Sequence, residues 1–409
     1  MASAEPERLV LVEHHAQQVG GHWHATLLRL AGAERKRGGA VSVAALHGMP
    51  PEVRGELRRL GVSVLTGPRR GDVVGWVFQA CAVTCAATCA ISSRVWRTRA
   101  FPYQFTLLAR CLTEAASLRA GGRASAAVVL TASEGLHALP ALLSGHSHVR
   151  IVHDVYTKPG RVLRWAERRA VRHAQPVAAM CTTHRVAADL LAVFPWLTPV
   201  VQPFAVIAPR DRIGDAERGS ARVRQGVSGT VPVACLIGGW WPHKDVGTVA
   251  RALRTLRRPI ILIVAGAPLD DDLLRRMRSA PKVEVIVHDR ALSEAELRDV
   301  YAACDLAIVS RHRTFAGECG IIADAIQYGV SLVCSDHDPV VSSALSATDW
   351  AALFPTADAD GLSATLDWVA EHPLARPSLA ETGRLGFRTA SEAVDDYLAL
   401  ARQLTASSR

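Results

Sequence analysis

The 409-residue sequence has no secretory leader, and its nine cysteines are scattered without the paired spacing of a disulfide framework. Both absences predict reduced thiols and a cytoplasmic protein. The sequence also has no zinc-finger spacing, no RNP-like aromatic strand and no helix-turn-helix pattern. The protein has a net charge of +9, chiefly from arginine, but we do not expect this charge to bind nucleic acid. The same positive charge would attract a phosphorylated substrate or an anionic membrane surface.

Residues 73–92 carry no charged side chain, yet their composition does not predict a membrane-spanning helix. A spanning helix needs about 20 strongly apolar residues, whereas Gln79, Thr84, Thr88 and many small residues interrupt this stretch. We expect a buried helix here. Insertion of the helix into a membrane surface is the alternative, and it would make the protein membrane-associated.

Two groups of residues could be taken for a metal site. His14, His15, His22 and His24 lie close in sequence, but imidazoles two positions apart do not share a helix face, and no later cluster completes a ligand set. The three aspartates at 270–272 precede a helical stretch, and acids in the first turn stabilise a helix without any metal. We therefore expect no metal site.

The chain is longer than one hydrophobic core usually supports, so its length predicts two domains. Residues 210–230, rich in Arg, Gly and Ser, predict a linker. This linker would join an N-terminal domain at 1–209 to a C-terminal domain at 231–385. A terminal helix at 386–409 follows. Apolar runs typical of buried parallel strands recur in both domains.

Two groups of candidate residues follow apolar strands of the N-terminal domain. Gly20, Gly21 and His22 come after the first strand, RLVLVE, as in many ligand-binding α/β domains. Their spacing is not GxGxxG, which disfavours a dinucleotide, and a tight turn without a ligand explains the glycines equally well. His153 and Asp154 follow a later strand and are expected at the carboxyl edge of the sheet, where ligands bind.

A strand-loop-helix-strand unit at 310–336 carries the clearest functional signal. Glu318 lies in the loop, Gly320 opens the predicted helix, Asp324 lies about one and a half turns further on, and Gly329 ends the helix. The free N–H groups of the helix N-terminus attract phosphate oxygens. A carboxylate repels phosphate, but it can accept hydrogen bonds from sugar hydroxyls. The combination therefore suits a nucleotide sugar.

This segment resembles the donor-binding loop of the retaining family 4 glycosyltransferases. In that family a Glu–Gly–Phe–Gly loop and a second Glu precede an Ala and a later Gly-Thr-Pro strand. Here Glu318, Cys319 and Gly320 match the loop, and Asp324 or Ala325 stands near the second acid. The interval is shorter than in the family, and the second acid is Asp rather than Glu.

A second segment, in which a strand and a glycine loop precede Lys244, resembles the diphosphate-binding loop of the same family. The family has an Arg just after the first Gly and a Lys a few residues later. Gly239 stands at the Arg position here, and only Lys244 matches. A cation from elsewhere in the chain must then supply the missing charge. If Lys244 does not bind phosphate, arginines near Arg290 or Arg311 are the alternative place for it.

The resemblance implies a GT-B fold, an α/β architecture of two Rossmann-like domains with parallel sheets facing a central cleft and a C-terminal helix crossing back to the first domain. It implies a metal-independent glycosyltransferase without a cofactor. The enzyme would move a sugar from a UDP- or GDP-sugar to a small-molecule or lipid-linked acceptor, with retention of anomeric configuration. The alternatives are a GT-B protein of altered chemistry (a pseudo-glycosyltransferase, epimerase or phosphorylase) and a non-catalytic nucleotide-sugar-binding protein.

The resemblance also implies a role for each site residue. Glu318 would orient the sugar hydroxyls, His153 would contact the sugar or the acceptor, and Lys244 would hold the diphosphate during catalysis. The other donor-binding residues would be Gly239, Arg290 near the base, Cys319, Gly320, Ile321, Ile322 and, at the ribose, Asp324. The acceptor and phosphate loop would comprise Gly20, Gly21, His22 and Asp154.

Overall fold

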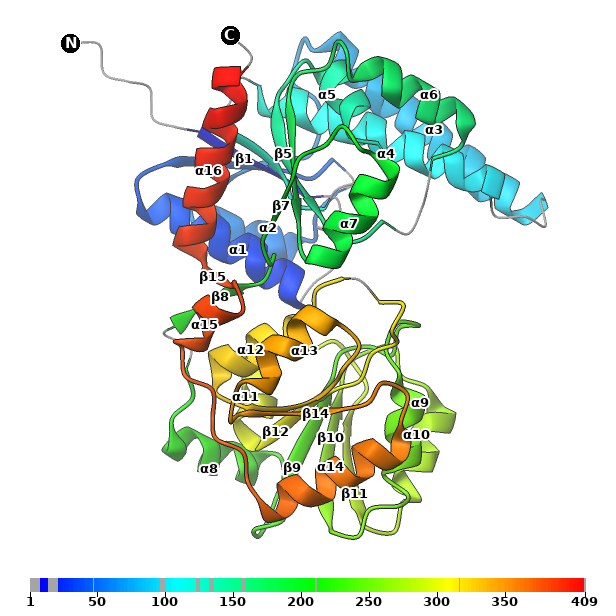
Figure 1. Ribbon diagram of the computed structural model, residues 1–409. Helices are drawn as coiled ribbons and strands as arrows, with labels where there is room; N and C mark the ends of the chain where they lie inside the picture. Colours follow the sequence, from blue (N-terminus) through cyan, green and yellow to red (C-terminus); the bar gives the residue numbers. More distant parts are fainter. Residues whose placement is uncertain are drawn as a thin grey trace. The chain divides into compact units, whose positions relative to one another are not determined.

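A computed structural model describes residues 8–13, 21–46, 48–95, 100–122, 126–131, 136–155, 159–209, 212–315 and 317–407. The chain divides into two units (Figure 1). Unit 1 comprises Met1–Val19, Thr26–Phe204 and Ala390–Arg409. Unit 2 comprises Gly20–Ala25 and Ala205–Thr389.

Unit 1 is built on a seven-stranded parallel sheet with the strand order β3-β2-β1-β4-β5-β6-β7. Its strands are β1 (Arg8–Val12), β2 (Ala40–Ala44), β3 (Ser63–Leu65), β4 (Ala126–Val129), β5 (His148–Val152), β6 (Val177–Cys181) and β7 (Pro199–Val201). Its helices are α1 (Gly21–Lys36), α2 (Pro51–Arg59), α3 (Val73–Val95), α4 (Ala100–Gly121), α5 (Ala138–Ser144), α6 (Arg161–Ala170), α7 (His184–Val193) and α16 (Ala390–Ser407). The central strands are buried, as expected for a parallel sheet covered by helices.

The charge-free stretch at 73–92 forms most of α3, and the prediction that this helix is buried was wrong. α3 packs along α4 (Figure 1), and Ala82 is buried, while Trp76 and Val83 are 53% and 64% exposed. The buried helix is α4, which contacts β1, β2 and β4 and has fully buried side chains at Leu107 and Cys111. Because α4 already covers the sheet there, apolar composition alone does not bury α3. No helix of the described residues is long and apolar enough to cross a membrane.

Unit 2 has a six-stranded parallel sheet with the order β11-β10-β9-β12-β13-β14, and a separate pair formed by β8 and β15. Its strands are β8 (Val206–Ile207), β9 (Val233–Ile237), β10 (Ile260–Ala265), β11 (Val283–His288), β12 (Leu306–Val309), β13 (Ser331–Ser335), β14 (Ala351–Phe354) and β15 (Arg388–Thr389). Its helices are α8 (Asp215–Arg224), α9 (Val246–Ala252), α10 (Asp271–Arg278), α11 (Glu294–Ala303), α12 (Gly320–Tyr328), α13 (Pro339–Ser346), α14 (Ala359–Glu371) and α15 (Glu381–Arg384).

Strand β9 shows why the central strands of unit 2, β10, β9 and β12, are uninterrupted apolar runs. Val233, Cys235 and Ile237 belong to the core on one face of the sheet, together with residues of α11 and α12. Ala234 and Leu236 belong to the core on the other face, together with residues of α9, α10 and α14. Since both faces are buried, no position of the strand favours a polar residue. The predicted α/β class is confirmed.

The chain enters unit 2 at Ala205, before the segment 210–230 that was expected as a linker. That segment contains α8, which packs on α11 and pairs Glu217 Oε1 with Arg298 Nε at 2.6 Å. Few residues of α8 are apolar, so the hydrophobic pattern of the sequence does not reveal a helix that is held to its neighbour by ion pairs. At the other end of unit 2, β15 pairs with β8. The chain then returns to unit 1 as α16, which contacts β4, β5 and β6.

Candidate functional site

The carboxyl ends of β9 and β12 form the topological switch point of unit 2, because the strand order runs in opposite directions from these two neighbours. Open α/β sheets bind their ligands at such a point. The loops that follow the two strands are joined there by an antiparallel bridge between Lys244 and Arg311. The N–H of His312 donates to the carbonyl of His243 (3.2 Å) beside it. The fold thus brings two cations from distant parts of the sequence to the expected ligand position.

Two glycines give the loop after β9 its shape. Gly238 has a φ of +83°, in the left-handed region that favours glycine. A Cβ added to Gly239 would lie 2.2 Å from the carbonyl oxygen of Ala267 and 2.9 Å from Pro268. No side chain fits at position 239 without a shift of the neighbouring backbone. The arginine that the resembling family carries at this position is therefore sterically incompatible with this loop.

Lys244 is partly buried at the end of the same loop. Its Nζ donates a hydrogen bond to the carbonyl oxygen of Ile237 at 2.7 Å. Burial, followed by the charge of Arg311, lowers the pKa of Lys244 to about 7. Within the described ranges no carboxylate forms an ion pair with Lys244. A cation held in this way is stabilised by any anion that binds beside it.

Helix α12 begins and ends where the sequence predicted, at Gly320 and before Gly329, whose φ is +67°. Its N-cap residue is Cys319, and no side chain caps the first turn. Arg311 Nη2 lies 3.5 Å from the Sγ of Cys319. Cys319 also acts on Lys244, whose pKa it raises against the larger effects of burial and Arg311. The positive end of the helix dipole and the two cations therefore point to one place.

Two aromatic side chains of this site were not identified from the sequence. His243 stacks on Phe315 with ring centroids 4.7 Å apart, and the guanidinium carbon of Arg311 lies 4.8 Å from the Phe315 centroid. Burial, then the charge of Arg311, lowers the pKa of His243 to about 4, so this imidazole is neutral at pH 7. The sequence did contain a signal for them, because His243 directly precedes Lys244 and Phe315 follows Arg311 by four positions.

The two acids of the predicted donor loop bind protein groups. Glu318 Oε1 accepts a hydrogen bond from the backbone N–H of Ala205 at 3.0 Å. Asp324 Oδ2 accepts one from the hydroxyl of Tyr301 at 3.1 Å, and burial raises the pKa of Tyr301 well above its usual range. Both acids lie on the β12–α12 side of the switch point. Their predicted contacts with sugar and ribose stay predictions.

Arg290 does not join the cluster around Lys244. It follows β11, at the edge of the sheet, and its guanidinium pairs with Glu296 at 2.5 and 3.0 Å. Glu296 also forms a capping box with Ser293 at the start of α11. This ion pair gives Arg290 a structural partner, and its contact with a nucleotide base stays a prediction.

The site residues predicted in the N-terminal domain are only partly described. His153 follows β5, its Nε2 donates to the carbonyl of Leu130 (2.8 Å), and its ring packs edge-on against Phe204. Asp154 is the next residue and is half-buried. At the switch point of this sheet, between β1 and β4, Thr131 donates to the buried Glu13 (2.7 Å), a pair that was not predicted. His14, His15 and Gly20 lie outside the described residues, as does the side chain of His22, while Gly21 begins α1.

The aspartates at 270–272 cap a helix, as predicted. Asp270 is the N-cap of α10 and accepts a hydrogen bond from Leu273 N at 3.0 Å, while Asp272 pairs with Arg275. The described residues contain no group of three or more His, Cys, Asp or Glu side chains that could hold a metal ion.

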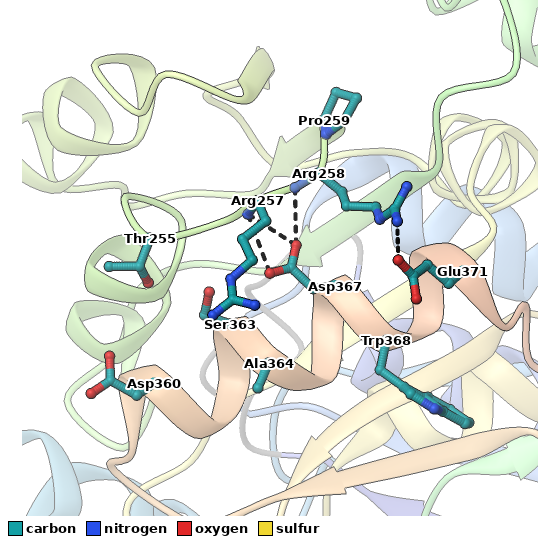
Figure 2. Close-up of a pocket in the computed structure, with 10 residues that line it drawn as sticks. All are labelled: Thr255, Arg257, Arg258, Pro259, Asp360, Ser363, Ala364, Asp367, Trp368 and Glu371. Carbon is teal, nitrogen blue, oxygen red and sulfur yellow. Dashed lines mark hydrogen bonds and ion pairs between the residues drawn. The ribbon is translucent and has the colours of Figure 1, made fainter.

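A cavity of about 830 Å³ lies at the opposite end of the sheet from the switch point, between the loop before β10 and helix α14 (Figure 2). Its polar groups bind one another. Asp367 accepts hydrogen bonds from the backbone N–H groups of Arg257 and Arg258, and the Arg258 side chain pairs with Glu371. These contacts hold the loop on α14, away from the carboxyl ends of the strands where open α/β sheets bind their ligands.

No protein-family model and no curated protein matches the sequence. Solved structures match nearly the whole chain. A glycosyltransferase from Rickettsia africae ESF-5 has a TM-score of 0.65 at 10% identity, over 98% of this chain and 99% of that one. The N-terminal domain of Candida albicans trehalose-6-phosphate phosphatase has a TM-score of 0.60 at 8% identity, over 99% and 98%. Anabaena Alr3699/HepE in complex with UDP and glucose has a TM-score of 0.59 at 12% identity, over 98% and 99%. At these identities the likeness shows the fold alone, and the chain has the predicted GT-B fold.

Proposed function

We propose that the protein is a glycosyltransferase and that unit 2 binds the diphosphate of a nucleotide sugar. The observation that carries the proposal is Lys244, which lies at the switch point, beside a helix N-terminus with no side-chain cap, and has no carboxylate partner among the residues described. Such a site favours an anion with several oxygens. The likeness to the Rickettsia enzyme and to HepE with UDP and glucose supports this ligand class.

The chemistry requires charge stabilisation more than an acid–base pair. When the bond between sugar and diphosphate breaks, negative charge builds on the leaving oxygen. Lys244 and the N–H groups of residues 319–322 would stabilise that charge. Glu318 would orient the sugar hydroxyls and Asp324 the ribose, and we propose that His153 contacts the sugar or the acceptor. In this scheme the donor is a UDP- or GDP-sugar, configuration is retained, and neither metal nor cofactor takes part.

The direct test is incubation with a panel of UDP- and GDP-sugars, with and without candidate acceptors, followed by measurement of released nucleoside diphosphate. Release that depends on an acceptor is the expected result. Conversion of the sugar without release would instead indicate altered GT-B chemistry, an alternative that the glycine at the family's arginine position favours. Tight binding with neither outcome would indicate a non-catalytic nucleotide-sugar-binding protein.

We also propose that unit 1 contacts an anionic membrane surface. Trp76, Val77 and Val83, in the charge-free stretch of α3, are each more than half exposed. Helix α6 exposes Trp165 among arginines at positions 161, 164, 168 and 169. Exposed apolar and aromatic groups together with basic ones suit the interface of an anionic bilayer. Such a contact would bring a lipid-linked acceptor to the enzyme.

A further inference from the structure

We propose that Arg311 is the second phosphate-binding cation of unit 2 and replaces, from a different strand, the arginine that position 239 cannot carry. This inference rests on the proposed function, since it assigns a residue to the same diphosphate site. It goes further in predicting that the site requires two neighbouring phosphates. Lys244 would bind one end of the diphosphate and Arg311 the other.

The surroundings of Arg311 are unusual for a structural arginine. Only 6% of its surface is exposed, and its Nη1 has no hydrogen-bond partner. The contacts of the guanidinium are a weak one with the Sγ of Cys319 and a cation–π contact with Phe315. No carboxylate in the described part of the chain pairs with it. A buried charge without a counter-ion is destabilising, so this arrangement favours a bound anion.

The acids in the loops around Arg311 are engaged elsewhere. Asp245, which follows Lys244, is the N-cap of α9 and accepts from the N–H of Thr248. Asp336, which follows β13, accepts hydrogen bonds from the N–H and hydroxyl of Thr356 (both 2.7 Å) and pairs with Arg313. Asp338 caps α13 through the N–H groups of its first turn. His337, in the same loop as these two aspartates, lies beside Ser335, and burial lowers its pKa. The positive charge around Arg311 and Lys244 is therefore not neutralised within the loop cluster.

The geometry also explains why the cation comes from β12. The backbone of Ala267 occupies the space of a side chain at Gly239, so Lys244 is the cation that the β9 loop offers. The bridge between Lys244 and Arg311 carries the second cation to the same point from the neighbouring strand. The Cys319 contact places its guanidinium at the N-terminus of α12. A planar guanidinium with a free N–H edge can bind phosphate oxygens in a bidentate way.

The test compares the wild type with Arg311→Met and Arg311→Lys in the full chain. Arg313→Met is the matched control, because Arg313 lies in the same loop but is exposed and paired with Asp336. Titration calorimetry is performed with inorganic pyrophosphate, UDP, GDP, UMP and GMP, and thermal unfolding is measured without ligand.

Arg311→Met should weaken pyrophosphate and the preferred nucleoside diphosphate by about 10- to 100-fold, and the corresponding monophosphate by less. Arg311→Lys should retain part of the affinity, because it keeps the charge but loses the planar guanidinium that binds two phosphate oxygens at once. The melting temperature of ligand-free Arg311→Met should not fall, since an uncompensated buried charge is removed. The control should bind like the wild type.

Unchanged diphosphate affinity in both Arg311 variants would overturn the inference while leaving the proposed function intact. The inference would also be overturned if Arg311→Met unfolds and Arg311→Lys binds diphosphate and monophosphate in the wild-type ratio. If the folded wild type binds neither pyrophosphate nor either diphosphate, the proposed function itself fails.

Discussion

Raising the pH from 7 to about 8.5 should weaken the binding of a nucleoside diphosphate, because Lys244 loses its proton in this range. Its pKa of about 7 lies far below the 10.5 of a free lysine, owing first to burial and then to Arg311. Below that pKa the side chain is a cation and attracts phosphate, and above it the side chain is a neutral amine. A bound diphosphate raises the pKa again, so binding in this range takes up a proton.

The magnitude follows from the fraction of Lys244 that is protonated. With a pKa of about 7, that fraction falls from about one half at pH 7 to about 3% at pH 8.5. A ligand that binds only the protonated form then loses about 16-fold in affinity. Removing the charge altogether, in Lys244→Met, should cost about 2–3 kcal/mol near pH 7, the scale of a lost charge-assisted hydrogen bond.

Titration calorimetry with UDP and GDP measures the dissociation constant over this range, and buffers of different ionisation enthalpy measure the proton uptake. The diphosphate itself is ionised above pH 7, and His243, with its pKa of about 4, stays neutral throughout. Lys244→Met should bind weakly with little pH dependence. Lys282→Met, at an exposed lysine before β11, is the control and should keep the wild-type slope. The reasoning is refuted if the wild-type affinity is constant with pH, or if Lys244→Met keeps the same slope.

Three further outcomes are expected. Glu318→Ala should lower transfer by about 100-fold if the carboxylate positions the reacting sugar. Glu318→Gln is the control for the hydrogen bond to Ala205, because an amide oxygen can still accept that bond while the negative charge is lost. Wild-type turnover in Glu318→Ala would rule the role out. Transfer should survive exhaustive EDTA treatment because protein cations neutralise the leaving group, and a loss restored only by manganese or magnesium would contradict this. The double substitution Trp76→Ser and Val77→Ser should reduce co-sedimentation with phosphatidylglycerol vesicles without lowering the melting temperature, since both side chains are more than half exposed; undiminished vesicle binding would exclude α3 as the membrane contact.

Local features were predictable because the interactions that fix them lie within a few residues. The start of α12 at Gly320 and its end before Gly329 were read directly from the sequence. The capping box at Ser293 and the Asp270 cap are equally local, each a side chain bonding a backbone N–H three residues on. The α/β class followed from uninterrupted apolar runs, since a strand covered on both faces needs no polar position.

Burial and long-range pairing were not predictable in this way. The composition of α3 suggested a buried helix, but only the packing of α4 onto β1, β2 and β4 decides which of the two helices covers the sheet. Likewise α8 has few apolar residues, and its ion pair with α11 forms only in the folded unit.

The sequence by itself determined the two ends of α12, the caps of α10 and α11, and Lys244 as a cation beside a glycine turn. Only the tertiary structure decided that β9 and β12 are neighbours, and so that Arg311 lies opposite Lys244. It also showed that the carbonyl of Ala267 excludes any side chain at Gly239. The physical reason is that strand order depends on how all helices cover the sheet, whereas hydrogen-bonded turns and caps depend on neighbours in the chain.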